Sequence, residues 1–327
     1  MMCLSFQPMS KALRQLVLRS AGLLLIGLMV SCSQLATEPP EINRISGTEI
    51  LDGPSTAAYL TTLYNRDFPN CHQSNSQPAF LCSGVTLRIT TKDPDNFYKV
   101  WDPSPISLKS GGVSFSYLRT DVRFTRPGPD YHNGFILYPI FGAPPDKIDL
   151  DYLCAYPMDA WGWNRSLTEV CGPSQQYPVQ SQLCWLAGVT TPQQWLAVWN
   201  LPGATPNLRQ CGFDVRDERN AYAGPAFYHS LQAKKLLGPT GFNEHNEVII
   251  KTWVPGHPNS FPIMAFFYIA GAPNQTQGLA EAQYNQRDFY NSTNPRILLP
   301  IIRLTPAASL SQGASFAYVA TDQVVRP

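Results

Sequence analysis

The chain has 327 residues, of which 44% are hydrophobic and 14% are charged. This composition is typical of a globular protein, and the length predicts two domains rather than one minimal core. The formal net charge is +1 and the sequence has no basic run, so nucleic acid is not expected as a partner.

Residues 1–31 have the organisation of a secretion signal. A basic region with Lys11, Arg14 and Arg19 precedes an apolar core that is too short to span a bilayer. The core ends in LMVSC, which resembles the lipobox read by the bacterial lipoprotein signal peptidase. We therefore expect export, with Cys32 as the lipidation site, and an outer-membrane lipoprotein or a secreted protein as the product.

The segment 32–50 is polar and contains prolines, which predicts a linker before a first domain at 51–185. A helix is predicted in 51–68, because Asp52 can cap it and Pro54 stands in its first turn. Apolar residues then recur at helical spacing. Three β-prone segments follow, at 80–90, 111–119 and 133–142.

The remaining residues, 186–327, are predicted to form a second, mixed α/β domain of unknown role. Its helices are expected at 190–200, 226–238 and 278–290. Its strands are expected at 247–254, 262–271 and 296–304. The fold class expected for the chain is α+β, with a β-rich first domain followed by this second domain.

Six cysteines lie beyond Cys32, and an even number in an exported chain predicts disulfide bonds. They are Cys71, Cys82, Cys154, Cys171, Cys184 and Cys211. Pairing in sequence order, Cys71 with Cys82, Cys154 with Cys171 and Cys184 with Cys211, is one of the many connectivities that six cysteines allow.

The histidines are scattered and no CxxC pair is present, so no metal is expected. The segment NEHNEV places His245 and Glu247 on one face of a possible strand, with His257 nearby. This pattern is a weak metal motif, and a solvated turn explains it equally well.

Familiar catalytic signatures are absent from the sequence, including GxSxG, the P-loop, GxGxxG after a strand and HExxH. What the sequence offers is Arg88 before the polar turn TTKDPDNF, then Ser114 and Ser116 in GGVSFSYLR, then Glu169 in NRSLTEVCG. This order resembles the cholera-toxin and pertussis-toxin type of ADP-ribosyltransferase. That family has an arginine on its first strand, a Ser-Thr-Ser-like strand, and a glutamate preceding a late strand.

The whole chain is also similar to the halovibrin family, secreted bacterial proteins described as ADP-ribosyltransferases that split NAD. The similarity is strongest across LCSGVTLRIT, GGVSFSYLR, NGFILYP and QCGFDVR. It implies an exported, toxin-like enzyme that consumes NAD, either an ADP-ribosyltransferase or an NAD glycohydrolase. The acceptor would be a protein or water.

Cleavage of the nicotinamide-ribose bond needs little catalytic machinery, because the leaving group already carries positive charge and departs neutral. One carboxylate can stabilise the oxocarbenium-like transition state and hold the ribose 2′-OH. Between Glu49 and Glu218 the sequence has one glutamate, Glu169. The resemblance therefore assigns catalysis to Glu169, with Asp159 as a fallback.

The same resemblance implies that Arg88 binds a phosphate of NAD and that Ser114 and Ser116 support the site. Aromatic candidates for stacking on nicotinamide are Tyr98, Trp101, Phe115 and Tyr117. Relatives that modify arginine or asparagine have Glu or Gln two residues before the catalytic glutamate, where this chain has Leu167. This departure favours hydrolysis of NAD or an unusual acceptor.

Two other functions fit the sequence. A noncatalytic envelope lipoprotein or adhesin could use its disulfides and aromatic residues to form a surface that binds a host or envelope partner. A hydrolase of another kind could have its site in the C-terminal half. The NAD enzyme requires Arg88, Ser114 and Glu169 to lie around one cleft.

Overall fold

The computed structural model describes residues 52–66, 83–90, 99–122, 124, 132–138, 152–159, 171, 184, 188–200, 211–215, 223–234, 245–256, 262–294, 296–309 and 311–325. Residues Asn43–Pro327 form one compact unit. The predicted secretion signal, the lipidation site Cys32 and the linker 32–50 lie outside the described residues.

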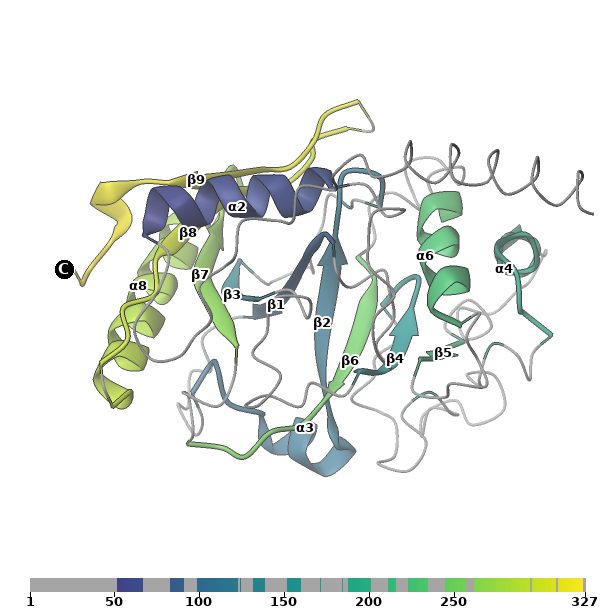
Figure 1. The fold of residues 1–327 in the computed structure, drawn as a ribbon, viewed down its shortest axis with the longest axis horizontal. Coiled ribbons are helices and arrows are strands. Elements are labelled where there is room, and N and C mark those ends of the chain that lie inside the picture. The colour runs from purple at the N-terminus through teal and green to yellow at the C-terminus, as the bar shows by residue number, and fades with distance from the viewer. Residues whose placement is uncertain are drawn as a thin grey trace, which may run out of the picture. The chain divides into compact units, whose positions relative to one another are not determined.

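A nine-stranded sheet forms the centre of the fold, with the strand order β5-β4-β6-β2-β1-β3-β7-β8-β9 (Figure 1). The strands are β1 Val85–Thr90, β2 Gly112–Leu118, β3 Asn133–Leu137, β4 Tyr152–Tyr156, β5 Phe213–Asp214, β6 Glu247–Lys251, β7 Ile263–Ile269, β8 Ile301–Thr305 and β9 Ser315–Tyr318. Neighbouring strands are antiparallel except β7 and β8, which are parallel. The mostly antiparallel sheet with separate helices agrees with the predicted α+β class.

The sheet combines strands from both predicted domains, 51–185 and 186–327. Strand β6 pairs with β2 on one side and with β4 on the other, and β7 pairs with β3. A division at residue 185 would separate strands that share backbone hydrogen bonds, so the sheet does not follow the predicted boundary. Near residue 185 the composition changes toward helix-forming residues, which predicted the boundary. Strand pairing between segments far apart in sequence does not affect local composition, so it could not be predicted in this way.

The helices of the described residues are α2 Gly53–Asn65, α3 Pro105–Ser110, α4 Pro192–Asn200, α6 Ala223–Lys234 and α8 Gln275–Ser292, with a 3₁₀ turn η8 at Ala320–Asp322. Four of them lie where the sequence predicts a helix, and α3 is additional. None of the helices in the described part of the chain has both the length and the hydropathy that crossing a bilayer requires.

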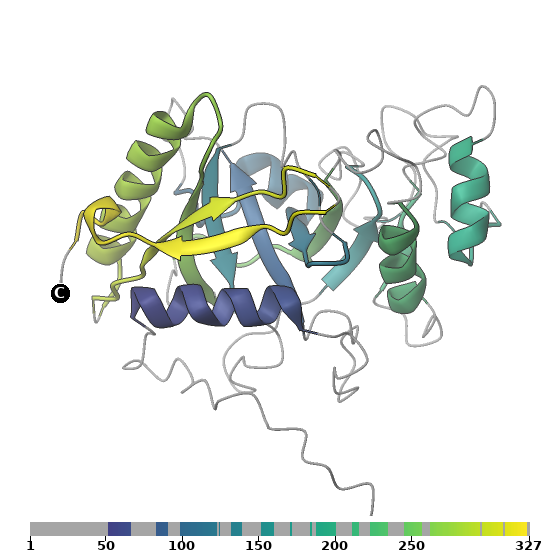
Figure 2. The same cartoon turned by 90° about the horizontal axis from the view of Figure 1, so that it is seen from above.

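Helix α2 begins where the sequence predicts. The carboxylate of Asp52 accepts a hydrogen bond from the backbone N–H of Ser55 at 2.7 Å, and this bond caps the helix. Its apolar side, which includes Leu60 and Leu63, is buried. The helix runs along β9 (Figure 2). The ring of Tyr64 contacts that of Phe316 edge-on.

One face of the sheet carries the largest hydrophobic cluster. It contains Phe115 of β2, Phe135 of β3 and Phe266 of β7, together with Phe227 of α6 and Phe289 of α8. Helices α6 and α8 therefore contribute to one continuous core, and burial of such aromatic side chains is the main force that holds the sheet to its helices.

Helix α8 is attached to β3 by buried polar contacts. The carboxylate of Glu281 accepts hydrogen bonds from Asn133 at 2.5 Å and from Gln277 at 2.9 Å. His132 Nε2 lies 3.1 Å from the same carboxylate, and Asn285 donates to Asn133 at 3.1 Å. These contacts satisfy polar groups that would otherwise be costly to bury.

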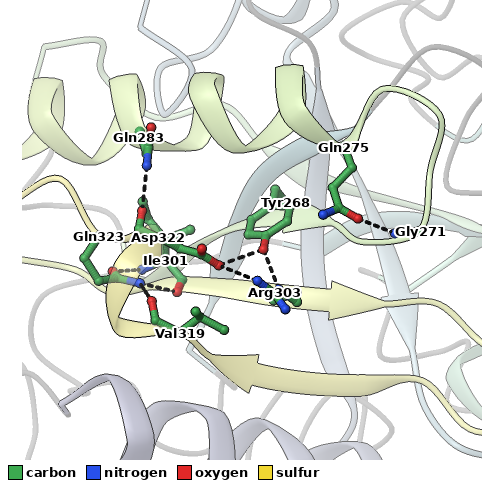
Figure 3. Close-up of polar contacts among 9 residues, drawn as sticks. All are labelled: Tyr268, Gly271, Gln275, Gln283, Ile301, Arg303, Val319, Asp322 and Gln323. Atoms are coloured by element: carbon green, nitrogen blue, oxygen red, sulfur yellow. Dashed lines mark hydrogen bonds and ion pairs between the residues drawn. The ribbon is translucent and has the colours of Figure 1, made fainter.

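The C-terminal segment is attached to the sheet by a second set of polar contacts, which we call the C-terminal network (Figure 3). Asp322 accepts from the Tyr268 hydroxyl at 2.7 Å and from Arg303 at 3.2 Å. The side-chain amide of Gln323 accepts from the N–H of Ile301 at 2.8 Å and donates to its carbonyl at 2.9 Å. The network thus extends the hydrogen bonding of β8 by side chains.

Two of the sequence-order disulfide pairings are confirmed. Cys154 is bonded to Cys171 with a Cα–Cα distance of 5.4 Å, and Cys184 to Cys211 with 4.7 Å. Cys154 lies on β4, so the first bond links Cys171 to the sheet. The other predicted pair, Cys71 and Cys82, lies outside the described residues.

Candidate functional site

Arg88 lies on β1, as expected, but its side chain is 9% exposed and has a structural partner. Its Nη1 donates a hydrogen bond to the backbone carbonyl of Asp102 at 3.1 Å. Across β3 it is paired with Phe135. The neighbouring Gly134 is required here, because a Cβ at that position would lie 1.9 Å from the Arg88 carbonyl oxygen.

The two serines of β2 lie on the opposite face of the sheet from Arg88. Ser116 pairs with Leu87, and side chains alternate between the faces from one residue to the next. Ser114 is exposed, whereas Ser116 is buried. The register places Arg88 beside Phe115 and Phe135, on the face opposite Ser114 and Ser116. The predicted cleft of Arg88, Ser114 and Glu169 stays a prediction, because Glu169 lies outside the described residues.

The predicted stacking residues are core residues where the structure describes them. Trp101, Phe115 and Tyr117 are each at most 2% exposed. The rings of Phe115 and Phe135 meet edge-on at 5.8 Å, on the face where Arg88 lies. These three side chains hold the sheet to its covering elements rather than offering a surface for nicotinamide. Tyr98 lies outside the described residues.

The assigned catalytic residue, Glu169, also lies outside the described residues, as do Leu167 and His257. The described part of the chain offers a different glutamate beside the serine strand. Glu247 is the first residue of β6, the strand that pairs with β2, and it is 2% exposed.

The start of β6 is fixed by Asn246, the residue before Glu247. Its side-chain oxygen accepts from the backbone N–H of Tyr117 at 2.7 Å, and its side-chain nitrogen donates to the Tyr117 carbonyl at 2.6 Å. The amide thus reproduces a backbone pair and extends the ladder between β2 and β6 by one step. These two hydrogen bonds fix the position of the main chain next to Glu247.

Ser116 and Glu247 face each other across these two strands. Phe115 pairs with Val248, so the next positions along the antiparallel register are Ser116 and Glu247. Opposite Cβ atoms in such a ladder are about 5 Å apart, within reach of a hydroxyl and a carboxylate. On its other side Glu247 pairs with Tyr156 of β4, which is fully buried. The three side chains form a polar row across β2, β6 and β4.

A second pair of ionisable groups lies at the residues just before β6 and just after β4. His245 precedes Glu247 by two residues, and its Nε2 lies 3.8 Å from the carboxylate of Asp159, which follows β4. The side chain of His245 is 17% exposed and that of Asp159 is 36% exposed. We call Ser116, Tyr156, Asp159, His245 and Glu247 the Glu247 region.

The backbone around this pair is held by Lys234, at the C-terminal end of α6. Its ammonium group donates to the Pro157 carbonyl at 2.7 Å and reaches the His245 carbonyl at 3.5 Å. The N–H of Asp159 donates to the His245 carbonyl at 3.1 Å. Burial lowers the pKa of His245, and the nearby Lys234 charge also lowers it, whereas Asp159 raises it.

On the Arg88 face of the sheet, Asp102 is an ionisable group with a shifted pKa. Burial raises the pKa of Asp102, while the hydrogen bond that its carboxylate accepts from the Gly256 N–H, at 3.0 Å, acts in the opposite direction. The positive charges of Lys99 and Arg88 also lower it. Arg88 thus belongs to a set of polar contacts that holds the segment around Asp102 in place.

The sequence contained a signal for Glu247 that the prediction did not use. The strand predicted at 247–254 begins at this residue, which satisfies the pattern of a glutamate at a late strand. With a boundary at 185, Glu247 lies outside the predicted catalytic domain 51–185. The NEHNEV pattern of His245 and Glu247 is a weak metal motif, and the described residues contain no cluster of three His, Cys, Asp or Glu side chains that could hold a metal ion.

Comparison with known proteins adds no family to these observations. The sequence matches no protein-family model, and no curated protein is significantly similar to it. The geometry of the Glu247 region and the motifs of the sequence are therefore the basis for inferring function.

Proposed function

We propose that the protein is an exported enzyme that cleaves the nicotinamide-ribose bond of NAD, with Glu247 as its catalytic carboxylate. Export through residues 1–31 and lipidation of Cys32 are part of this proposal, as is a fold of the ADP-ribosyltransferase type. The observation that carries it is the buried position of Glu247 opposite Ser116 on the adjacent strand.

The order of the strands supports the proposal. In the resembled toxin family an arginine strand, a serine strand and a late strand with a glutamate follow one another in sequence. Here the strands that carry Arg88, Ser116 and Glu247 are neighbours in the sheet, in the order β1, β2, β6. This neighbouring order of the strands is the reason for assigning to Glu247 the role that the resemblance gives to a glutamate, although Arg88 and Ser116 lie on opposite faces of the sheet.

The chemistry suits a carboxylate held in this way. As nicotinamide departs, positive charge develops at C1′ and the ring oxygen of the ribose, and a carboxylate in a water-poor setting stabilises that charge more strongly than it would in bulk water. The Ser116 hydroxyl can donate to the carboxylate of Glu247 and so fix its orientation. No general acid is needed, because nicotinamide leaves as a neutral molecule.

Arg88 has a different role in this proposal from the one that its motif implies. Its bond to the Asp102 carbonyl secures the segment that follows the polar turn, so it supports the first strand from the opposite face. Replacement by Lys would lose part of this bonding, because an ammonium group lacks the planar fork of the guanidinium.

The test is nicotinamide release from NAD by the oxidised mature protein, with Glu247→Gln and Glu169→Gln as matched variants. We expect Glu247→Gln to lower the rate by at least about 10²-fold, because the charge that stabilises the transition state is removed. Glu169→Gln should keep the wild-type rate. Circular dichroism and urea unfolding of each variant establish that both fold as the wild type does.

The other outcomes are equally informative. Activity in Glu247→Gln together with its loss in Glu169→Gln would return the catalytic role to Glu169. No turnover and no NAD binding by the folded wild type would reject the enzyme and favour the noncatalytic envelope lipoprotein or adhesin.

A further inference from the structure

We propose that the exposed apolar side chains of α3 and of the segment 252–256 form a surface that docks on an anionic lipid bilayer. Neither segment has a role in the proposed cleavage of NAD. The described part of the chain exposes four large hydrophobic side chains, which are Ile106 at 55%, Leu108 at 41%, Val254 at 64% and Tyr284 at 40%. The first two belong to α3, the third to the segment 252–256 and the fourth to α8.

The segment 252–256 follows β6 and runs alongside α3 in the opposite direction (Figure 1). At one end the N–H of Thr252 donates to the carbonyl of Gly111, just after α3, at 3.1 Å. At the other end the N–H of Gly256 donates to the carboxylate of Asp102, before α3, at 3.0 Å. Six helical residues span about 9 Å, so the exposed apolar side chains of both segments share one small area. We call Ile106, Leu108 and Val254 the α3 patch.

Helix α3 has the reverse of the usual pattern of a surface helix. Its buried residues are Ser107 and Ser110, while Ile106 and Leu108 are exposed. The Ser110 hydroxyl donates to the carbonyls of Ser107 at 3.1 Å and Gly112 at 3.2 Å, so the inner face is bonded to the backbone. Surface helices normally turn apolar residues inward and polar residues to water. The outer face of α3 is therefore suited to an apolar environment.

The exposure of Val254 is fixed by the residue before it. The indole Nε1 of Trp253 donates to the carbonyl of Trp101 at 3.2 Å, and its ring lies 6.4 Å from that of Phe115 on β2. Trp253 thus occupies the place against the sheet. Val254 cannot bury its side chain there without displacing an indole that already packs on the core.

The charges at the α3 patch match an anionic bilayer. Lys109 is the last residue but one of α3, and Lys251 is the last residue of β6; both are exposed. Asp102, the acidic residue before α3, is 6% exposed, and its carboxylate is bonded by the N–H of Gly256. On a bilayer the apolar side chains would enter the boundary of the acyl region, and the ammonium groups would meet the lipid phosphates.

A protein partner fits the α3 patch less well than a bilayer does. A stable protein–protein interface buries about 800 Å² on each side. Even an aromatic side chain buries only about 150–250 Å², so the three aliphatic side chains of the patch supply far less than such an interface needs. Insertion into lipid needs no complementary surface, and each apolar side chain that leaves water contributes to it.

The test is co-sedimentation of the oxidised chain 32–327 with lipid vesicles. This chain contains the whole compact unit Asn43–Pro327, and it carries Cys32→Ser so that no lipid anchor contributes. One set of vesicles is phosphatidylcholine alone, and the other also contains the anionic lipid phosphatidylglycerol. We expect binding to the anionic vesicles and at least about tenfold weaker binding to the neutral ones, because two lysines face the headgroups.

Two variants of this parent chain separate the apolar from the electrostatic contribution. Ile106→Ser, Leu108→Ser and Val254→Ser together should weaken binding to the anionic vesicles at least about tenfold, because less apolar area leaves water. Lys109→Gln with Lys251→Gln should weaken it by about tenfold and leave binding to neutral vesicles unchanged. Circular dichroism and urea unfolding establish that both variants fold as the parent does.

Helix α8 provides the matched controls. Tyr284→Ser removes an exposed hydrophobic side chain, and Arg287→Gln removes an exposed positive charge, both outside the α3 patch. We expect both variants to bind vesicles as the parent does, since the effect depends on position and not on the mere loss of an apolar or charged side chain.

Three results would overturn the inference. The first is a folded parent chain that binds neither set of vesicles. The second is equal binding by the parent and the triple serine variant. The third is a dimer in sedimentation equilibrium that the triple variant dissociates, because a second copy of the chain would then cover the patch. Nicotinamide release is measured separately, so none of these results bears on the proposed function.

Discussion

The Glu247 region and the C-terminal network both consist of polar side chains at the sheet, but the hydrogen-bond partners and the exposure of these side chains differ. In the C-terminal network the amide of Gln323 bonds both backbone groups of Ile301, and Asp322 is bonded by Tyr268 and Arg303. In the Glu247 region a pair of ionisable side chains meets at 3.8 Å with both partly exposed. Polar groups that bond the backbone stabilise the fold, whereas a partly exposed pair of ionisable groups can meet a substrate.

The largest effect on stability should come from removing the disulfide of Cys154. Replacing Cys154 and Cys171 by Ala is expected to cost about 3 kcal/mol of unfolding free energy, because the crosslink no longer restricts the unfolded chain. Cys154 lies on β4 two residues before Tyr156, so nicotinamide release should also fall. Urea unfolding and the NAD assay at low temperature measure the two effects.

The disulfide between Cys184 and Cys211 provides the matched control. Its removal should destabilise the protein by a comparable amount and leave nicotinamide release unchanged, since it does not lie on β4, β6 or β2. Equal loss of activity in both double variants would contradict the prediction that the disulfide on β4 supports the Glu247 region and the other disulfide does not.

A smaller effect is expected in the C-terminal network. Asp322→Ala should lower the unfolding free energy by about 2 kcal/mol, since the Tyr268 hydroxyl loses its acceptor; the exposed part of Arg303 is screened by solvent and adds less. Asp322→Asn, which keeps an acceptor oxygen, should lose less. Both variants should release nicotinamide at the wild-type rate, and a folded variant with reduced turnover would show that the two regions are coupled.

Much of the fold could be predicted from local signals in the sequence. Asp52 and Pro54 fixed the start of α2, and runs of β-branched and aromatic residues located β1, β2, β3, β6, β7 and β8. Helix α3 was missed although Ser104 caps it and Gly111 ends it with a φ of 75°, because six residues are too few to show a helical period. Strands β5 and β9 were missed because they have two and four residues, and β4, with five residues like β3, was missed as well.

The site was less predictable for a physical reason. Whether Arg88 and Ser116 share a face depends on the register of β1 and β2, which local residues do not specify. Similarly, the proximity of Glu247 to Ser116 depends on pairing between strands more than 100 residues apart in sequence, as the Phe115 and Val248 pair shows. The assumed boundary at 185 then removed Glu247 from consideration, although its motif was visible.

The most direct measurement is a crystal structure of Glu247→Gln with NAD, in which loss of the carboxylate should allow the intact dinucleotide to persist. We expect the nicotinamide ribose to lie against residue 247 and the Ser116 hydroxyl, on the face of the sheet opposite Arg88. NAD bound instead on the Arg88 face beside Phe115, or away from β6 altogether, would contradict the assignment of Glu247 as the catalytic carboxylate.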